Sequence, residues 1–440
     1  MFTKVRLKNF KSFSDITFDI SDNKRSKNLV VLYGKNGSGK SNVMSAFVFL
    51  NELIVTMNVR DRYEAFLAHE EELKKINDEN ISMMLRQQFL DGLRNIKSII
   101  DDYKMIDSNG NIVAEYNFVI DDKAGIYSIE LDDNEIISEK LEFVLNKRKG
   151  VYFQCSKGKY FINNAIIKDT ALMDSVKQST YKYWGKHSIL AILIHEIDDK
   201  AKSFAENNFS DNLNLLLDHF RLMSSSLSVG QRRWHSLCTK FPIAFQPVNG
   251  SVQVDREKEL EKFADIFSKV FYYTNSKINR LYYKKVYQKS NIEYELFERK
   301  LIDGRFIDIP FERESTGNHK LLDFFCNFIN AALGQIVILD EADAGIHELQ
   351  FKNLLEALQP YITGQLIMTV HNTFLMELKD ARKFTYIIDD TDKIKIRSIN
   401  DYDKRTFANN NIRIRYLSGK YKGIPENANV DFGLIFKELE

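Results

Sequence analysis

The sequence predicts an α/β fold built on a buried parallel sheet, and three stretches predict it. They are VVLYGKNGSGKSNVMSAFVFL at 30–50, QIVILDEAD at 335–343 and GQLIMTVHNT at 364–373. Each begins with the near-continuous apolar run that is typical of a strand buried on both faces. Each run then ends in glycine or polar residues. Because α/β folds bind ligands at the carboxyl ends of their strands, we expect these ends to form a site.

The first stretch predicts a phosphate-binding loop between a strand and a helix. GKNGSGKS at 34–41 fits G-x-x-x-x-G-K-[ST] without a mismatch. Glycines at 34, 37 and 39 permit the tight turn that aims backbone N–H groups at phosphate oxygens, next to the helix N-terminus. Lys40 is expected to reach the β- and γ-phosphates, and Ser41 to ligate Mg²⁺. The predicted nucleotide-binding residues are Asn36, Gly37, Ser38, Gly39, Lys40, Ser41 and Asn42.

The second stretch supplies the acidic residues that ATP hydrolysis needs. Asp340 follows the apolar run 336–339, and Glu341 comes next. We expect Asp340 to hold Mg²⁺ through water and Glu341 to polarise the attacking water. With Lys40 and Ser41, these residues predict ATP and Mg²⁺ as cofactors.

The third stretch ends in His371, which lies 31 residues after Asp340. A histidine at the end of this strand can hydrogen-bond the γ-phosphate and sense its hydrolysis. The predicted catalytic residues are therefore Lys40, Glu341 and His371.

A helix that precedes the acidic strand has its N-terminus at FERESTGN. Apolar residues recur after it at helical spacing, namely Leu321, Leu322, Phe325, Phe328, Ile329 and Ala332. Ser315 and Gly317 lie just before this helix, so its N-terminus can face a γ-phosphate.

Together, MFTKVRLKNFKSF, GKNGSGKS, ESTGN, ILDEAD and TVHNT resemble the ABC-type ATPase heads of the SMC, RecF and Rad50 superfamily. More narrowly, the chain resembles the AAA15 family, which includes abortive-infection (AbiLi/RloA-like) proteins and the ATPase subunit of PARIS phage defence. The segment NIRIRYLSGKYKGIPENANVDF at 411–432 resembles the usual ending of that family. The resemblance covers roughly the first 50 and the last 150 residues.

The resemblance implies a P-loop NTPase fold of ABC/SMC-head type. Alternating apolar residues at 113–167 predict an antiparallel sheet that flanks the core, and helical periodicity at about 168–285 predicts a helical insertion. The resemblance also implies that two heads sandwich two ATP molecules, so that a signature on one subunit contacts the γ-phosphate held by Lys40 of the other. That signature would be Glu314, Ser315, Gly317 and Asn318, and a D-loop would contain Ala344, Gly345 and His347. Asn318 stands where the family often has Thr, and His347 where many relatives have Asp. The Q-loop stays open between Gln87, Gln88 and Gln154.

SSSLSVGQ at 224–231 is a rival for the signature, because it contains LSxGQ. In heads of this type the signature helix runs directly into the acidic strand. Ser228 precedes Asp340 by 112 residues, whereas Ser315 precedes it by 25. We therefore interpret the rival as a serine-rich loop that caps a helix, with Ser228 as a candidate N-cap.

The chain is expected to divide into three parts. Residues 1–167 form the N-terminal part of the head, with flanking strands and a charged helical insertion at about 53–104. Residues 168–285 form a compact helical insertion without sustained heptads. Residues 286–440 form the C-terminal part of the head, with the signature, the acidic strand, the D-loop and His371.

Composition narrows the class of protein. A formal net charge of +1 makes no demand for a nucleic-acid partner. Three cysteines without CxxC spacing argue against a disulfide scaffold or a zinc site and fit a cytoplasmic protein. The N-terminus has no apolar signal segment, and ILAILI at 189–194 is too short to span a bilayer.

One basic and aromatic stretch, NRLYYKKVYQK at 279–289, is open to two interpretations. It can bind a phosphate backbone while tyrosines stack on bases, or it can be an exposed face with its lysines in solvent; we favour the second. RDRYEAF at 60–66 and QRRWH at 231–235 are equally open. TYIIDDTDKIKIRSI at 385–399 is expected to be a hairpin, and we infer no nuclease in this chain.

Two functions follow from these observations. The favoured one is the sensor and scaffold of an anti-phage system, a homodimer or higher homo-oligomer that detects a phage product and controls an effector encoded nearby. The alternative is a RecF- or SMC-like ATPase that binds DNA in repair or maintenance, and a weaker third is an NTP-dependent regulator. No membrane partner is expected, and a nucleic acid is not required.

Overall fold

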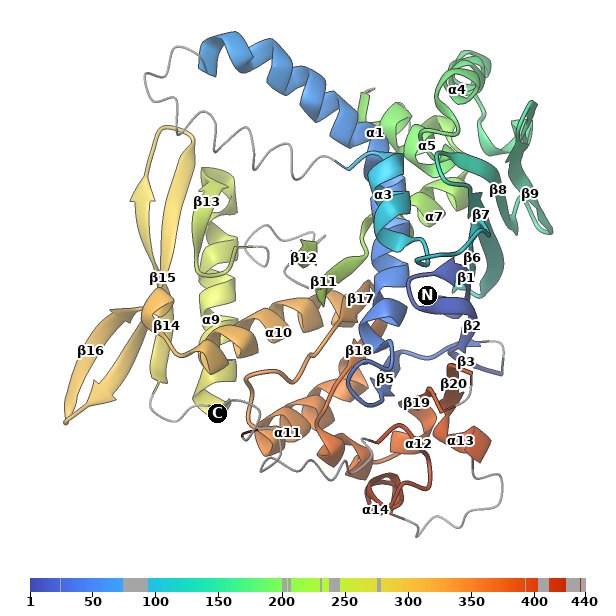
Figure 1. The fold of residues 1–440 in the computed structure, drawn as a ribbon. Coiled ribbons are helices and arrows are strands. Elements are labelled where there is room, and N and C mark those ends of the chain that lie inside the picture. Colours follow the sequence, from blue (N-terminus) through green and yellow to red (C-terminus); the bar gives the residue numbers. More distant parts are fainter. Residues whose placement is uncertain are drawn as a thin grey trace.

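The structure is a computed structural model of the chain. It describes residues 1–23, 25–73, 94–199, 204, 207–229, 232–236, 246–274, 278–391, 393–402, 411–424 and 436. Its elements are arranged around two seven-stranded sheets (Figure 1). The predicted α/β class, with a parallel core and a flanking antiparallel sheet, is confirmed.

The central sheet has the strand order β12-β11-β17-β18-β5-β19-β20. Its strands are β5 (Leu29–Tyr33), β11 (Ser224–Val229), β12 (Arg232–Ser236), β17 (Ile336–Leu339), β18 (Gln365–Thr369), β19 (Thr385–Asp389) and β20 (Lys395–Ser398). Parallel pairing joins β11, β17, β18, β5 and β19, while β12 and β20 pair antiparallel at the edges. All residues of β5, β17 and β18 are buried, which explains their apolar sequences.

Helices cover both faces of this sheet. Val30 and Leu32 of β5 pack in the same cluster as helix α1 (Lys40–Leu73). Val31 of the same strand packs in a second cluster, with helices α10 (Thr316–Ala332) and α11 (Glu348–Leu358). This alternation fixes β5 between two helical layers and holds the loop that follows it.

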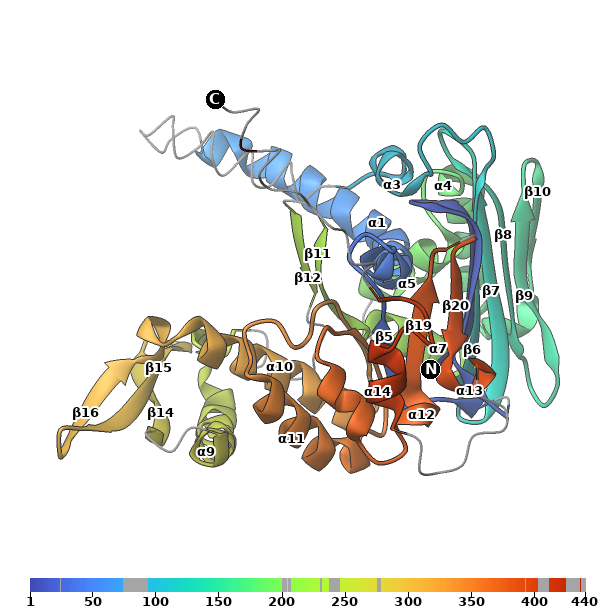
Figure 2. The ribbon, with the colours of Figure 1, turned by 60° about the horizontal axis from the view of Figure 1, so that its bottom comes forward.

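The second sheet is antiparallel, in the order β10-β9-β8-β7-β6-β1-β2. Its strands are β1 (Phe2–Phe10), β2 (Phe13–Asp19), β6 (Ile112–Ile120), β7 (Lys123–Leu131), β8 (Ile136–Val144), β9 (Lys149–Ser156) and β10 (Lys159–Ile162). Helix α1 lies between the two sheets (Figure 2), and its apolar side chains share one core with both. In the described part of this lobe lie also the helices α3 (Ile96–Tyr103), α4 (Thr170–Tyr183), α5 (Ile189–Asp199) and α7 (Asp211–Arg221).

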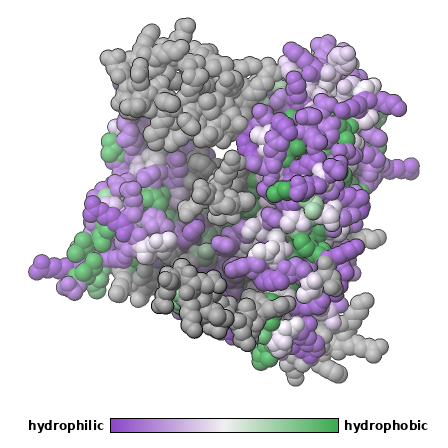
Figure 3. Space-filling view, in the orientation of Figure 1, coloured by the Kyte–Doolittle hydropathy of each residue, from purple (hydrophilic) through white to green (hydrophobic). Residues whose placement is uncertain are grey.

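A smaller sheet stands at the far end of the molecule, on the left of Figure 1. It contains β13 (Asn249–Gln253), β14 (Ile278–Tyr287), β15 (Asn291–Ile302) and β16 (Arg305–Pro310), and α9 (Glu257–Thr274) packs against it. The β15–β16 hairpin exposes Leu301, Phe306 and Ile307, and apolar surface gathers around β16 in Figure 3. From β16 the chain continues through η3 (Phe311–Arg313) into α10.

The structure corrects two expectations about the middle of the chain. Segment 168–285 is not helical throughout, because it also contains β11, β12, β13 and most of β14. The expected serine-rich loop is wrong, since Ser228 lies within strand β11 and not at the start of a helix. Strand β11 forms because it pairs with β17, a partner more than 100 residues away. The three-part division of the chain stays a prediction.

Residues after β18 form the β19–β20 edge of the central sheet. The expected hairpin is confirmed as β19 paired with β20. Helix α14 (Ile412–Leu417) leads to Gly423, where an added Cβ would lie 2.6 Å from the Ile387 side chain and 3.7 Å from the Gly34 Cα atom. The C-terminal segment therefore supports the back of the phosphate-binding loop.

The remaining short elements are β3 (Ser21–Asp22), β4 (Arg25–Ser26), η1 (Asn164–Ile166), η2 (Val254–Arg256), η4 (Gln359–Tyr361), η5 (Thr373–Glu377), α12 (Ala381–Phe384) and α13 (Ile399–Tyr402). Among the described residues, no helix is both long enough and apolar enough to cross a membrane.

Candidate active site

One pocket of about 270 Å³ collects residues from all three predicted stretches. It opens at the carboxyl ends of β5, β17 and β18. Its lining residues are Asn36, Gly37, Gly39, Lys40, Ser41, Asn42, Asp340, Glu341 and His371. The two predicted metal ligands, Ser41 and Asp340, and the three predicted catalytic side chains therefore meet in one cavity. Ser38, also predicted to bind nucleotide, is buried and does not line the pocket.

The glycine-rich loop has the backbone conformation that its sequence predicts. Gly37 and Gly39 have φ values of 78° and 99°, a region that favours glycine. Gly34 is needed for a different reason, because a Cβ there would lie 2.2 Å from the Ile388 side chain. The loop is thus fitted closely against β19.

Lys40 lies over the loop with its ammonium group largely buried. Its Nζ donates to the carbonyl oxygens of Gly34 at 2.7 Å and Lys35 at 3.1 Å. Burial lowers the pKa of Lys40, and the carboxylates of Asp340 and Glu341 oppose that shift. The ammonium group therefore lies on the acidic side of the pocket, where it can bind an incoming phosphate.

Thr369, at the end of β18, organises the acidic pair, and the sequence analysis missed it. Its hydroxyl donates to Oδ1 of Asp340 and accepts from the backbone N–H of Glu341 at 2.8 Å. Glu341 has a φ of 50°, so its backbone is held in a region that is uncommon for a non-glycine residue. A polar residue ending an apolar strand two residues before His371 was the signal that could have identified it.

Thr369→Val is expected to lower the turnover number for ATP by about tenfold to a hundredfold, equivalent to about 1.4–3 kcal/mol. Valine keeps the shape of the side chain but removes the hydroxyl, so Asp340 loses a donor and the N–H of Glu341 loses its acceptor. Phosphate release at saturating ATP measures the effect. Thr369→Ser, which keeps the hydroxyl, serves as the control, and unchanged turnover in Thr369→Val contradicts this role.

A second unpredicted residue, Asp343, ties the His371 loop to the acidic loop. Its Oδ2 accepts from the backbone N–H groups of His371 at 2.9 Å and Asn372 at 2.6 Å. Asn372 in turn donates from its side chain to the carbonyl of Glu348 at 2.7 Å. Movement of either loop is therefore transmitted to the other.

The predicted signature lies at the start of α10 and does not line the pocket. Ser315 is the N-cap, and its Oγ accepts from the N–H of Asn318 at 3.3 Å. Gly317 packs directly against the predicted D-loop, since an added Cβ would lie 2.9 Å from the carbonyl oxygen of Gly345. Two residues further on, His347 caps α11 through its ring Nδ1. Ala344 and Gly345 lie in the turn between β17 and α11.

The three Q-loop candidates lie elsewhere. Gln154 is an exposed residue of β9, on the antiparallel sheet, and does not line the pocket. Gln87 and Gln88 fall outside the described residues.

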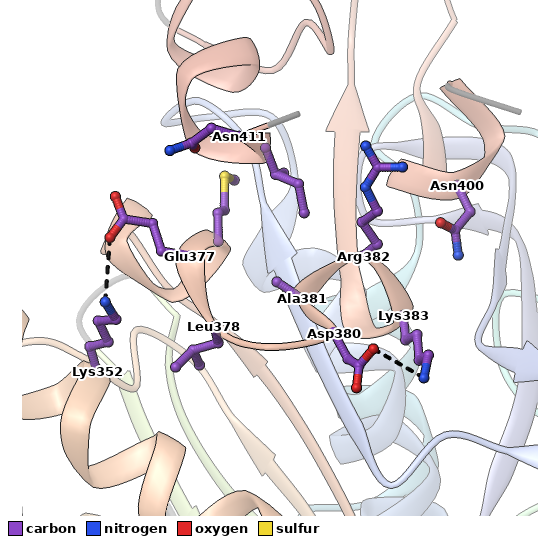
Figure 4. A pocket seen from close by; sticks show the side chains of 11 residues that line it. Lys352, Glu377, Leu378, Asp380, Ala381, Arg382, Lys383, Asn400 and Asn411 are labelled. Carbon is purple, nitrogen blue, oxygen red and sulfur yellow. Dashed lines mark hydrogen bonds and ion pairs between the residues drawn. The ribbon is translucent and has the colours of Figure 1, made fainter. Parts of the chain in front are cut away.

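A larger, open pocket of about 820 Å³ is lined by residues on and beside α11, η5, α12, α13 and α14 (Figure 4). Two of its cations already pair with acids of the same pocket: Lys352 with Glu377 at 3.3 Å, and Lys383 with Asp380 at 3.1 Å. None of the predicted site residues lines it.

One family model covers every residue that lines the pocket. A protein-family model described as "AAA domain, putative AbiEii toxin, Type IV TA system" matches residues 29–377, which is more than half of the chain. No curated protein matches the chain.

Solved structures of SMC heads are similar at low identity. An SMC head bound to the C-winged helix domain of ScpA has a TM-score of 0.43 and 14% identity, covering 92% of this chain and 99% of that one. The SMC head domain from Thermotoga maritima has a TM-score of 0.37 and 16% identity, covering 90% of this chain and 98% of that one. The Pyrococcus furiosus Smc head with an extended coiled coil, bound to the C-terminal domain of ScpA, has a TM-score of 0.41 and 14% identity. It covers 92% of this chain and 98% of that one.

The narrower resemblance to AAA15 and PARIS proteins stays a prediction. The family match spans the phosphate-binding loop, the acidic strand and His371. The chain therefore belongs to the family described as "AAA domain, putative AbiEii toxin, Type IV TA system", and it is a P-loop NTPase of the ATPase type.

Proposed function

We propose that this chain binds and hydrolyses ATP as a self-associating, ABC-type ATPase, and that it serves as the sensor or scaffold of an anti-phage abortive-infection system. A separate effector, such as a nuclease, would carry the toxic activity, and a phage protein would be the trigger. The observation that carries the ATPase part is the convergence of Lys40, Asp340, Glu341 and His371 on one pocket. The defence part is supported by the toxin–antitoxin description of the family.

Each lining residue has a role in this proposal. Backbone N–H groups of residues 36–42 and the ammonium of Lys40 bind the phosphates. Glu341 accepts a proton from the attacking water, and His371 contacts the γ-phosphate. The hydroxyl of Ser41 and the carboxylate of Asp340 are oxygen donors of the kind that Mg²⁺ prefers, so both residues fit the ion. When bound, Mg²⁺ neutralises charge that develops on the phosphates.

The position of the predicted signature supports a site completed by a second copy. Ser315 and Gly317 lie at a helix N-terminus outside the pocket, next to the predicted D-loop. We infer that this N-terminus faces the nucleotide of a partner chain, where its N–H groups would bind the γ-phosphate. Hydrolysis would then be coupled to assembly.

Ser315→Arg is expected to reduce ATP turnover at least about a hundredfold, about 2.7 kcal/mol, while ATP affinity stays near that of the wild type. Arginine adds a long charged side chain at the N-cap and blocks the approach of a second copy. Ser228→Arg, in the rival stretch, is expected to leave turnover within about threefold, less than 1 kcal/mol. Phosphate release measures both variants. The reverse pattern contradicts this assignment of the signature.

The basic stretch on β14 supports the DNA-binding alternative less than its sequence suggested, because several of its side chains have partners within the chain. The Tyr283 hydroxyl is buried and donates to the carbonyl of Pro247 at 2.8 Å. Lys285 pairs with Glu257 at 2.9 Å and Glu261 at 3.1 Å, and Lys284 lies over the ring of Phe297. The other two stretches, 60–66 and 231–235, have no described side-chain environment. ATP turnover stimulated by DNA, with a steep salt dependence, would favour the alternative.

A further inference from the structure

The sequence predicts that Glu314 contacts a nucleotide across a dimer. In the structure its side chain instead contacts residues of its own chain. Its side chain is only 8% exposed. One carboxylate oxygen pairs with Lys300, and the other accepts from the N–H of Ser315 at 3.1 Å and from the side-chain amide of Asn318. Both oxygens are therefore engaged within the chain. Glu314 is suited to fix the shape of the turn, and it is not suited to bind a ligand.

Lys300 links this turn to the small sheet. It lies on β15, and its side chain is 15% exposed. Its ammonium group lies between two carboxylates, Glu314 and the fully buried Glu298, whose Oε1 is 2.9 Å away. Burial raises the pKa of Glu298, and Lys300 opposes that shift. Removing Lys300 would leave two carboxylates with little solvent and without the ion pairs that now stabilise them.

The chain between Lys300 and Glu314 forms a hairpin followed by a short turn. It turns at Asp303 and Gly304, which have φ values of 49° and 74°, and returns along β16. Arg299 clamps the hairpin with two hydrogen bonds to Asp308, at 2.8 and 3.0 Å. The contact between Lys300 and Glu314 closes this loop at its base, so the direction of the β15 strand is transmitted to Ser315.

We propose that Lys300 is a positioning residue for the ATPase signature: through Glu314 it holds the Ser315 turn in the shape that meets a nucleotide bound by a second copy. The inference rests on the proposed function, in which Ser315 acts across the dimer. It assigns Lys300 and Glu298 to the same machinery, although both lie on the small sheet, outside the ATP pocket. Lys300 acts only through Glu314 and touches no reacting atom.

The test compares Lys300→Met with Lys300→Arg, which keeps the charge. Glu298→Gln/Lys300→Met removes the buried carboxylate together with the cation. It therefore separates loss of positioning from the destabilisation that follows when Glu298 is left charged and buried without Lys300. Lys289→Met, at an exposed lysine between β14 and β15, is the matched control. Three quantities are measured for the full chain: the ATP dissociation constant, the turnover number, and hydrogen exchange of the amides at 315–319.

Lys300→Met and the double variant are expected to lose at least about tenfold in turnover, with ATP affinity within about threefold and faster exchange at 315–319. Lys300→Arg should recover most of the turnover, and Lys289→Met should match the wild type. The proposal is overturned if Lys300→Met keeps full turnover, or if exchange at 315–319 is unchanged. Loss of ATP affinity together with melting of the whole chain also overturns it.

A wild-type chain that binds no ATP, or does not hydrolyse it, would instead refute the proposed function. The exchange measurement needs no nucleotide and would still decide whether Lys300 fixes the turn. The two failures are therefore distinguishable.

Discussion

Lys40→Ala is expected to weaken ATP binding by two to three orders of magnitude, about 2.7–4 kcal/mol. Among the described residues that line the pocket, Lys40 is the one lysine or arginine. Without it, the triphosphate loses its side-chain cation, and the carboxylates of Asp340 and Glu341 repel the phosphates more strongly. The loop itself should keep its shape, because the glycines and the contact with β19 hold it.

Titration calorimetry with ATP and Mg²⁺ measures this loss. Lys35→Ala is the control within the same loop, since the Lys35 ammonium pairs with Asp390 at 3.0 Å and does not line the pocket. We expect that control to bind within about fivefold of the wild type, about 1 kcal/mol. If Lys40→Ala binds ATP as tightly as Lys35→Ala does, the pocket is not the nucleotide site.

Glu341→Gln is expected to bind ATP normally and to lose about two to four orders of magnitude in turnover, the usual contribution of a general base. Glutamine has the same shape as glutamate but accepts no proton from water. The backbone contacts of residue 341 with Thr369 do not depend on its side chain, so the site should remain assembled.

Phosphate release and ATP affinity, measured on the same preparation, test this prediction. Glu356→Gln, on an exposed position of α11, controls for loss of one negative charge. Equal loss of turnover and affinity in Glu341→Gln would mean that the carboxylate is structural. Unchanged turnover would move the general base to another residue.

The ATP pocket could be predicted from the sequence because its residues lie in short, contiguous patterns. The loop at 34–41, the acidic pair and His371 each directly follow a buried strand, so local spacing is enough to bring them to one edge of the sheet. The same reasoning predicted the hairpin of β19 and β20 from its alternation and turn.

The residues that were missed depend on partners distant in sequence. Strand β11 is rich in serine and is held by pairing with β17 and β12, whereas local propensity favoured a loop there. Thr369 gains its role from Asp340, 29 residues earlier, and Asp343 from His371. The inward turn of Glu314 depends on the register of the β15–β16 hairpin, which brings Lys300 back to the start of α10.

The central claim is that a complete ATPase site needs two chains. The measurement that tests it most directly is the mass of Glu341→Gln in solution, by light scattering, with and without Mg²⁺ and ATP. We predict a species of at least twice the chain mass of 51.4 kDa at saturating ATP. If that assembly is present only with ATP, it acts as a nucleotide-driven clamp; if it is large and persists without ATP, it acts as a scaffold. A single chain mass with ATP fully bound would contradict the claim.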